Sequence, residues 1–385
     1  MVNNDNNDLN APTLLPPEPI EPIDKRKKAA AIEAMELADM IWTEAMNTAE
    51  SFGTEEDDLR AFIANADDSI INPQQKYEDP DSFLNDEDCP VFVRGDFSIT
   101  EGQAKSRKTF LSALLVSLLL SDGTRPTEAR FRTPTKCNRV LWFDTEQGKP
   151  RTARILKRLN KMGGDTSKIT MFSMRELGAV GRFKTLLYFI VLYRPDFVLI
   201  DGVADLMNNP NDIPESAMIR QMLMTASSRY NCHISAVLHC NEKGDTSTAR
   251  GQVGSELTRK CSTVIHLETV GNDTTKVTYT RTRDKKPEPF FIGVMEVDGY
   301  AIPAFVDESN VPKKAATSKR IIADYKSLQE FCKSKVSGVR YCDLSNFLEE
   351  NRDIKSETTI ERRIEGAVSE GFIEKNDSTG LYYPH

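Results

Sequence analysis

The segment from residue 99 to residue 109 combines glycine, lysine and threonine at a spacing suited to binding phosphate. Against the pattern G-x-x-x-x-G-K-[ST], it matches at Gly102, Lys108 and Thr109 and departs at Arg107. Backbone N–H groups at a helix start hold phosphates, the lysine supplies charge to the β- and γ-phosphates, and the hydroxyl binds Mg²⁺. The candidate nucleotide-binding loop is Gly102, Gln103, Ala104, Lys105, Ser106, Arg107, Lys108, Thr109 and Phe110.

The arginine at position 107 stands where the pattern has its second glycine. Arg107 keeps the backbone N–H that binds phosphate, but it lacks the freedom of glycine at positive φ. We therefore expect reduced freedom in the loop, with the guanidinium facing phosphate or a neighbouring molecule.

Carboxylates follow two apolar segments further along the chain. Residues 139–143 lead into Asp144-Thr145-Glu146, and residues 197–200 lead into Asp201. In α/β sheets, active sites gather at the carboxyl ends of strands. Asp201 suits a Mg²⁺ ligand and Glu146 suits the group that orients or deprotonates water. A helix N-cap is the alternative role for Asp201.

The elements that position these residues follow an alternation of apolar β-type runs and longer helical stretches. From Val91 to about Asp307 this pattern predicts an α/β fold with a mostly parallel sheet flanked by helices. Strands are predicted at 97–100, 140–144, 169–173, 197–201, 234–239 and 263–267, with an antiparallel extension at 276–281 and 290–297.

In this order the motifs resemble those of the RecA-like P-loop ATPases, over roughly residues 90–300. The sequence is most similar to RepA-type hexameric replicative helicases of plasmids and mobile elements, with DnaB-like helicases and RadA as more distant relatives. The resemblance implies ATP and Mg²⁺ as cofactors, with Glu146 as catalytic base. It also implies that His239, at the end of Ala236-Val237-Leu238-His239, is a phosphate sensor.

The same resemblance implies a homo-oligomeric ring of six subunits that moves on single-stranded DNA. An initiator, a primase or another element-encoded protein would be its partner. The polar loop 241–254 corresponds to loops that contact DNA, here through Lys243 and Arg250; an ordinary flexible loop is the alternative. Arg283 is the first candidate for a finger that completes a neighbour's site, with Arg281 and Lys285 behind it. A solvated basic strand end is the alternative.

Composition divides the chain into five parts. We expect a disordered leader at 1–24, a helix and an acidic linker at 25–88, a RecA-like ATPase domain at 89–307, a linker at 308–318 and a winged-helix domain at 319–385. The helix spans 26–50, with Ala34, Leu37, Ile41 and Ala45 on one face, and docks on its own domain or on a neighbouring subunit. In the last domain we expect three helices and a hairpin, the third helix opening with a capping box of Thr358 and Glu361.

The charge is uneven along the chain. Residues 1–90 hold 6 Lys and Arg against 22 Asp and Glu, whereas the remainder holds 44 against 36. The acidic leader either shields the mildly basic body or is a solvated tail. Residues 313–385 hold 13 basic and 12 acidic residues, so protein docking or weak duplex contact is favoured there over specific DNA recognition.

The seven cysteines include no C-x-x-C pair, which favours a reducing compartment over a disulfide framework or a zinc ribbon. The longest apolar runs, 111–120 and 186–193, are about half the length of a membrane span. The N-terminus does not fit a signal peptide. We expect a cytoplasmic protein without a membrane partner.

Two other functions fit the sequence. The first is an ATP-switched DNA-binding regulator or recruitment factor without unwinding activity, which Arg107, the near-neutral C-terminal domain and the acidic leader favour. The second is an inactive ATPase that serves as a scaffold. The presence together of Lys108, Thr109, Glu146 and Asp201 argues against it.

Overall fold

The computed structural model describes most of the chain. It describes residues 24–46, 63, 70–121, 130–240, 249, 251–270, 274–283, 285–311, 319–335, 337–352, 354, 356–376 and 378–385. The chain divides into two compact units, Met1–Glu268 with Thr275–Phe305, and Thr269–Thr274 with Val306–His385. The expected leader at 1–24 lies almost wholly outside the described residues, as does most of the expected linker at 308–318.

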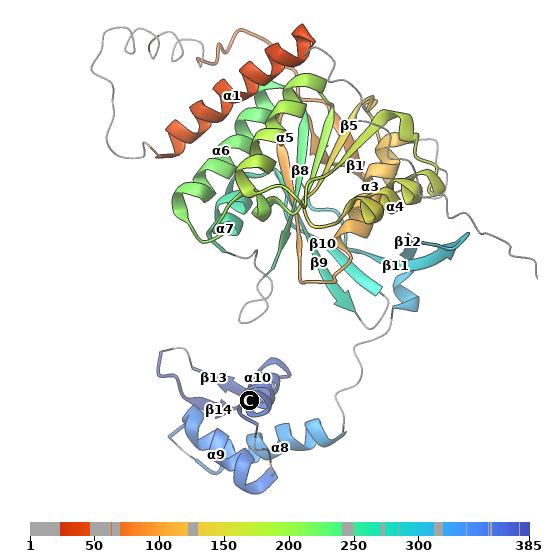
Figure 1. The fold of residues 1–385 in the computed structure, drawn as a ribbon. Coiled ribbons are helices and arrows are strands. Elements are labelled where there is room, and N and C mark those ends of the chain that lie inside the picture. The colour runs from red at the N-terminus through yellow and green to blue at the C-terminus, as the bar shows by residue number, and fades with distance from the viewer. Residues whose placement is uncertain are drawn as a thin grey trace, which may run out of the picture. The chain divides into compact units, whose positions relative to one another are not determined.

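A nine-stranded sheet forms the centre of the first unit, with helices on both of its faces (Figure 1). Its strand order is β12-β11-β10-β9-β3-β8-β7-β5-β6. The bounds are β3 Phe97–Gly102, β5 Val140–Asp144, β6 Ile169–Ser173, β7 Phe197–Asp201, β8 His233–His239, β9 Thr263–Val270, β10 Thr274–Arg281, β11 Phe290–Val297 and β12 Tyr300–Val306. The pairings from β6 across to β9 are parallel, and β10 pairs with β11 antiparallel. The predicted α/β class and the strands predicted between residues 97 and 297 are confirmed, whereas β12 was not predicted.

The two faces of the sheet are covered by different helices because alternate side chains of each strand point to opposite sides. In β5, Leu141 and Phe143 join one apolar cluster, and Val140 and Trp142 join the other. The first cluster lies under α5 Ala179–Tyr193, α6 Ile213–Arg229 and α7 Gly251–Lys260, and the second lies under α3 Lys108–Leu120 and α4 Lys149–Lys161. Short 3-10 helices span Thr166–Lys168, Val203–Leu206 and Glu308–Asn310. No helix among the described residues is long and apolar enough to cross a membrane.

A small sheet of order β2-β1-β4 begins inside the acidic linker that was predicted to follow the first helix and to end at residue 88. Its strands are β1 Ser82–Asp86, β2 Cys89–Val93 and β4 Phe131–Arg132. Phe83 and Leu84 of β1 are fully buried in the core of the first unit. Asp86 is buried as well, because its carboxylate accepts hydrogen bonds from Arg130 and from the Tyr279 hydroxyl at 2.6 Å. The folded unit thus includes residues assigned by composition to an acidic linker.

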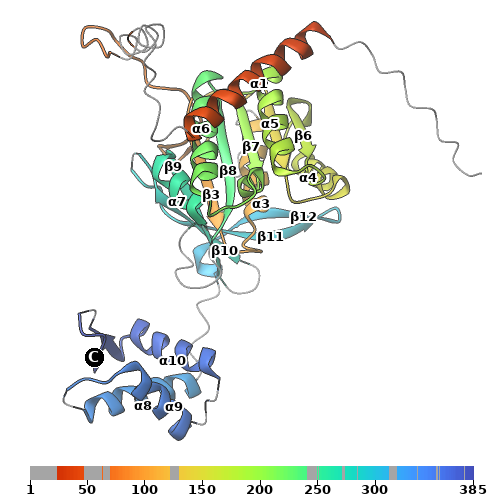
Figure 2. The ribbon, with the colours of Figure 1, turned by 60° about the vertical axis from the view of Figure 1, so that its left-hand side comes forward.

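The N-terminal helix α1 spans Lys25–Met46, against a predicted range of 26–50. It lies across α5 and α6 of its own unit, as Figure 2 shows. Its buried side includes the predicted Ala34, Leu37 and Ile41, whereas the side chain of Ala45 is outside the described part. Glu33 extends the contact through an ion pair with Arg194 at 2.9 Å. Of the two docking sites considered, the structure therefore contains the one on the helix's own unit.

The second unit contains three helices followed by a two-stranded hairpin, in the predicted order. The elements are α8 Lys319–Lys333, α9 Tyr341–Arg352, α10 Glu357–Ser369, β13 Ile373–Lys375 and β14 Tyr382–Pro384. Leu328, Leu344 and Ile360 are buried at its centre, and the buried Asp324 pairs with Arg352 and Arg363. The predicted capping box is wrong, because the N-cap of α10 is Ser356 and Thr358 already lies inside the helix.

Candidate active site

The loop between β3 and α3 leads from a strand end to a helix start. β3 ends at Gly102 and α3 begins at Lys108. The first N–H groups of a helix have no intrahelical acceptor, so this position attracts phosphate. Gly102 has no room for a side chain, because an added Cβ would lie 2.6 Å from Oγ of Ser106 and 2.8 Å from the carbonyl oxygen of Leu267. The following loop residues, Gln103, Ala104 and Lys105, are exposed.

Arg107 adopts the backbone conformation that glycine adopts most readily. Its φ is 68° and its ψ is 29°, in the left-handed region. The guanidinium Nη1 donates a hydrogen bond to Oγ1 of Thr275 at 3.2 Å, and Thr275 is buried on β10. The side chain thus reaches a neighbouring strand of its own unit. The missing glycine leaves the loop conformation possible, at a cost in strain.

Lys108 is buried and folds back over the start of the loop. Its Nζ donates hydrogen bonds to the carbonyl oxygens of Gly102 and Gln103, both at 2.8 Å. It also lies 3.2 Å from Nδ1 of His239. Burial lowers the pKa of the Lys108 ammonium, while Glu146 is the main charge that raises it. The Lys108 ammonium is therefore held by carbonyl oxygens, and phosphate oxygens can replace these as its hydrogen-bond acceptors.

Thr109 and Asp201 meet beside this lysine. The hydroxyl of Thr109 donates to Oδ2 of Asp201 at 3.0 Å. Asp201 ends β7 next to β5, and the pairing register places it directly opposite Asp144. Burial, and then the charge of Asp144, raise the pKa of Asp201 to about 7. The site thus contains buried negative charge in excess, together with a hydroxyl oxygen.

Asp144 positions the segment that carries Glu146. One of its carboxylate oxygens accepts the backbone N–H groups of Glu146 at 3.1 Å and Gln147 at 2.8 Å. Its other oxygen accepts the hydroxyl of Thr152 on α4 at 2.8 Å. Burial raises the pKa of Asp144, and these hydrogen bonds oppose that effect. The sequence identified Asp144 only as part of a strand end, whereas the structure gives it a structural role in the turn.

Glu146 and His239 form a pair across the site. Nε2 of His239 lies 2.9 Å from Oε1 of Glu146, and both side chains are about half exposed. The hydrogen bond from His239 is the main reason that the pKa of Glu146 lies below its usual value. The catalytic and sensor candidates from the sequence, Lys108, Glu146 and His239, are therefore connected directly.

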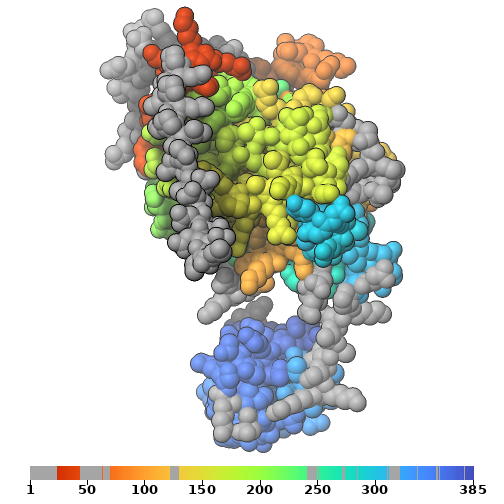
Figure 3. All heavy atoms as spheres, turned by 45° about the vertical axis from the view of Figure 1, so that its right-hand side comes forward, coloured from red at the N-terminus to blue at the C-terminus, as the bar shows by residue number. Residues whose placement is uncertain are grey.

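These residues border one cleft of about 570 Å³ at the carboxyl end of the sheet. Its wall also includes Arg151, Arg154 and Arg158 of α4, which are not among the predicted site residues. The Arg158 guanidinium lies 4.2 Å from the centre of the Phe110 ring, and its Nε donates to the carbonyl oxygen of Ala301 at 2.7 Å. Figure 3 shows this side of the first unit, with the yellow region of α4 beside the cyan β11 and β12. The repeat of arginines at helical spacing after Glu146 was a signal that could have found them.

The candidate finger residues lie elsewhere in the chain. Arg283 pairs with Asp96 at 3.0 Å, and Asp96 directly precedes β3, at the opposite end of that strand from Gly102. Arg281 donates to the carbonyl oxygen of Thr258 at 3.2 Å, and Lys285 is exposed. The structure does not bring these residues to the cleft of their own chain. Lys243 and Arg250, the DNA-contact candidates, lie outside the described residues.

No protein-family model and no curated protein sequence matches this chain. Among solved structures, the crystal structure of the RadB recombinase is similar, at 15% sequence identity and a TM-score of 0.39. The match covers 54% of this chain and 90% of that chain. A likeness at this level does not show a function for this chain.

Proposed function

We propose that this protein is a Mg²⁺-dependent ATPase of the RecA-like type that acts on DNA. The observation that carries this proposal is the convergence of Lys108, Asp201 and Glu146 on one cleft at the carboxyl edge of a parallel sheet. Phosphoryl transfer to water needs a cradle for phosphates, a cation ligand and a group that positions water. Residues suited to all three tasks are present within this cleft.

The acidic part of the cleft fits a hard divalent cation. The pKa of Asp201 is raised to about 7 by burial and by Asp144, so its negative charge is poorly compensated within the protein. Thr109 adds a hydroxyl oxygen, and oxygen donors are the ligands that Mg²⁺ prefers. Asp201 and Thr109 would hold the ion. When bound, it supplies positive charge to the phosphates of the nucleotide.

The chain's own residues supply the remaining tasks. Lys108 and the N–H groups of the loop bind phosphate oxygens in place of the carbonyls that Lys108 now contacts. Glu146, with its pKa held low by His239, is ionised at neutral pH and accepts a proton from water. His239 touches both Lys108 and Glu146, so it is suited to report the state of the phosphates.

The DNA role follows from the resemblance to ring-forming helicases. In this proposal six copies form a ring, Arg283 completes a neighbour's site, and Lys243 and Arg250 contact single-stranded DNA. Arg281 and Lys285 are the alternatives for the finger. The ring then moves along DNA during replication or transfer of a plasmid or mobile element, with an initiator or primase as partner. Arg283 would leave its ion pair with Asp96 and contact the neighbouring subunit's nucleotide instead. Hydrolysis would then depend on assembly of the ring.

A second function is favoured by two observations. Residues 313–385 are nearly balanced in charge, and Lys108 makes contacts within its own loop that a nucleotide must displace. These features suit an ATP-switched regulator or recruitment factor, which binds nucleotide, changes its assembly and hydrolyses slowly without unwinding DNA.

Steady-state ATP hydrolysis with Mg²⁺ tests the proposal, measured without DNA and with single- or double-stranded DNA. We expect single strands to stimulate turnover. Lys108→Ala should abolish nucleotide binding, whereas Glu146→Gln should lower kcat by about 100-fold with binding retained. Lys161→Ala and Glu176→Gln are the matched controls, because neither residue lines the cleft.

Each outcome of this measurement has a distinct meaning. Stimulation by single strands that both cleft substitutions abolish supports a motor. Tight ATP binding with slow hydrolysis that is indifferent to DNA favours the switch. Absence of ATP binding by the native chain overturns both functions.

A further inference from the structure

Three side chains with metal-binding atoms come together beside the start of the nucleotide-binding loop. Glu101 lies near the end of β3, His266 lies on β9, and Cys240 follows directly after β8. Because β3 pairs with both β8 and β9, its residue Glu101 lies opposite His266 in the register, with Cys240 at the other neighbouring strand. One carboxylate oxygen, one imidazole nitrogen and the sulfur all lie within 4.8 Å of one another.

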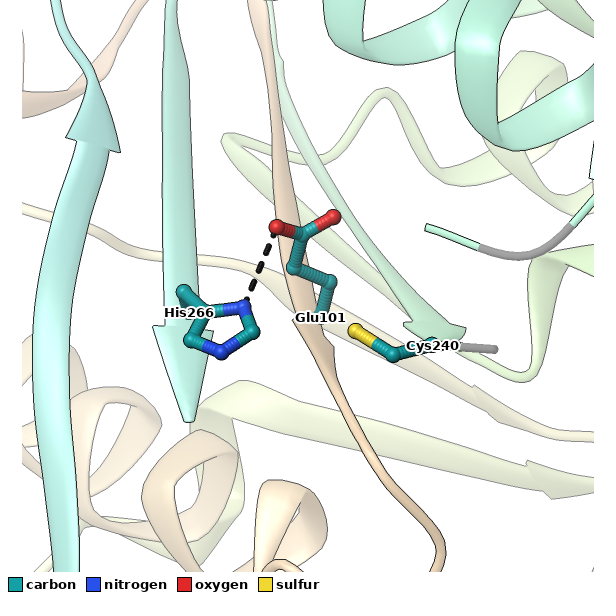
Figure 4. A group of neighbouring side chains, drawn as sticks. All are labelled: Glu101, Cys240 and His266. Carbon is teal, nitrogen blue, oxygen red and sulfur yellow. Dashed lines mark hydrogen bonds and ion pairs between the residues drawn. The ribbon is translucent and has the colours of Figure 1, made fainter. Parts of the chain in front are cut away.

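Figure 4 shows how the three groups face one another. The imidazole lies on one side of the Glu101 carboxylate, and the sulfur of Cys240 points toward Glu101 from the other side. Oε1 of Glu101 lies 3.2 Å from Nδ1 of His266. All three groups therefore reach one small volume, from β3, from β9 and from the residue that follows β8.

The carboxylate of Glu101 is in an unusual environment for an ionisable group. The residue is only 3% exposed, and glutamate is rarely buried to this degree without partners. Its Oε2 is buried and has no hydrogen-bonding partner within the part of the chain that the structure describes. A buried oxygen left in this state is costly unless it binds a proton donor or a cation. The cluster thus has an acceptor available inside it.

We propose that Glu101, Cys240 and His266 bind one divalent cation of the zinc class. Thiolate sulfur, imidazole nitrogen and carboxylate oxygen are the donors that Zn²⁺ combines, whereas Mg²⁺ prefers oxygen alone. This site is therefore chemically distinct from the oxygen donors of Thr109 and Asp201. Binding releases the thiol proton of Cys240 to solvent, because the thiolate is the ligand.

The geometry allows such an ion with small movements. Ligand atoms around a tetrahedral zinc ion lie about 3.3–3.8 Å apart, and those of the cluster all lie within 4.8 Å of one another, so they must approach by at most about 1.5 Å. Rotation of the Glu101 and Cys240 side chains would have to provide this change. Three protein ligands leave a fourth position for water, and the side chain of His266, 16% exposed, marks the route to solvent.

An ion at this position would join the carboxyl ends of β8 and β3 to the middle of β9. The backbone N–H of Cys240 donates to the carbonyl oxygen of Gly102 at 3.0 Å, and the same oxygen accepts Nζ of Lys108. A cation held by Cys240 and Glu101 therefore stabilises the end of the strand from which the nucleotide-binding loop begins. Its binding does not depend on ATP hydrolysis.

The test uses the full chain, stripped of metal by a chelator and then titrated with Co²⁺ in the absence of nucleotide. We expect one Co²⁺ per chain, with a thiolate-to-cobalt charge-transfer band and the intense visible bands of tetrahedral coordination. Added Zn²⁺ should displace the Co²⁺ and remove these bands, whereas an excess of Mg²⁺ should leave them unchanged.

Variants assign the ligands. Cys240→Ser should abolish the charge-transfer band, and His266→Gln and Glu101→Gln should each weaken Co²⁺ binding at least tenfold. Cys261→Ser is the matched control, a partly buried cysteine of the same unit, and should keep the band. Circular dichroism checks that each variant is folded. If Cys240→Ser does not fold, the weaker Co²⁺ binding of the isosteric Glu101→Gln tests the site instead. A native protein without the band, a band that persists in Cys240→Ser, or Co²⁺ binding that Glu101→Gln does not weaken overturns the proposal.

Discussion

Nε2 of His239 lies 2.9 Å from Oε1 of Glu146, so a residue that ends β8 pairs with a residue that follows β5. The pair spans β7, the strand between them, which ends at Asp201. On its other side, the His239 ring accepts from the Lys108 ammonium at Nδ1, which places the ring proton of the neutral tautomer at Nε2. One imidazole therefore connects the phosphate-binding lysine to the candidate base.

This connection predicts the pH dependence of hydrolysis. The hydrogen bond from His239 lowers the pKa of Glu146, and Glu146 must be ionised to accept a proton from water. Removing the bond in His239→Ala should raise that pKa. As the pH is lowered, the variant should therefore lose activity at a higher pH than the native protein does. We also expect kcat to fall at least tenfold.

The measurement is the pH profile of kcat/KM for ATP. His385→Ala is the control, because this terminal histidine lies in the second unit. An acidic limb at the same pH in His239→Ala and in the native protein would contradict the assigned role of the pair.

Asp201 predicts a second pH effect, on stability in the absence of Mg²⁺ and nucleotide. Its pKa is about 7 in the folded chain, against 3.8 for an ordinary aspartate. The folded state thus favours the protonated form, and the stability that this form contributes is full below pH 3.8 and is lost as the pH rises through 7. Asp201→Asn removes the dependence, and it should be more stable than the native protein at pH 8 by roughly 2–4 kcal/mol.

Urea denaturation at pH 5 and pH 8 measures this difference. Tryptophan fluorescence is a suitable probe because both tryptophans, Trp42 and Trp142, belong to the first unit. The advantage of Asp201→Asn should shrink at the lower pH, whereas the exposed Asp298→Asn should behave like the native chain at both. An equal effect of Asp201→Asn at pH 5 and pH 8 would refute the predicted titration.

The central sheet and the nucleotide-binding loop could be predicted because their signals are local. Apolar runs such as 197–200 are short and are followed by a carboxylate. The residues from Gly102 to Thr109 that are proposed to bind phosphate are consecutive in the sequence. Asp144 and Asp201 could be placed at one sheet edge because parallel strands bring their carboxyl ends together. Local patterns thus fixed most of the residues that line the cleft.

Contacts between distant segments account for what the sequence did not predict. The residues of β1 were predicted as part of an acidic linker. A buried strand can contain Asp86 because its carboxylate accepts hydrogen bonds from Arg130 and Tyr279, which lie far away in the sequence. The three arginines of α4 have helical spacing, but their place at the cleft depends on how α4 packs beside α3. The cluster of Glu101, Cys240 and His266 joins residues from three strands, with no spacing signal between them.

The backbone of Arg107 predicts an unusual order of stability among variants. At φ 68° any residue with a Cβ is strained, so Arg107→Gly should be more stable than Arg107→Ala by about 1 kcal/mol. Both variants lose the hydrogen bond to Thr275, so their difference isolates the backbone effect. Urea denaturation followed by tryptophan fluorescence measures it.

Lys157 provides the matched control in an ordinary conformation. It is exposed in the middle of α4, where alanine should be more stable than glycine by about 1 kcal/mol. The sign should therefore reverse between the two positions. Equal or greater stability of Arg107→Ala than of Arg107→Gly would mean that the loop does not hold residue 107 in the left-handed region.

The packing of α1 on its own unit predicts a large effect of a single truncation. Leu37 is 1% exposed and lies in the apolar cluster that α1 shares with α5 and α6. Leu37→Ala should lower the free energy of unfolding of the first unit by about 2–4 kcal/mol, because it removes buried methyl groups and leaves a cavity. Met35→Ala, at a position 57% exposed on the same helix, should change it by less than about 0.5 kcal/mol.

Fluorescence of Trp42 on α1 and of Trp142 in the core monitors both variants during urea denaturation. If Leu37→Ala were as stable as Met35→Ala, α1 would not be packed on its own unit in solution, and docking on a neighbouring subunit would become the favoured interpretation.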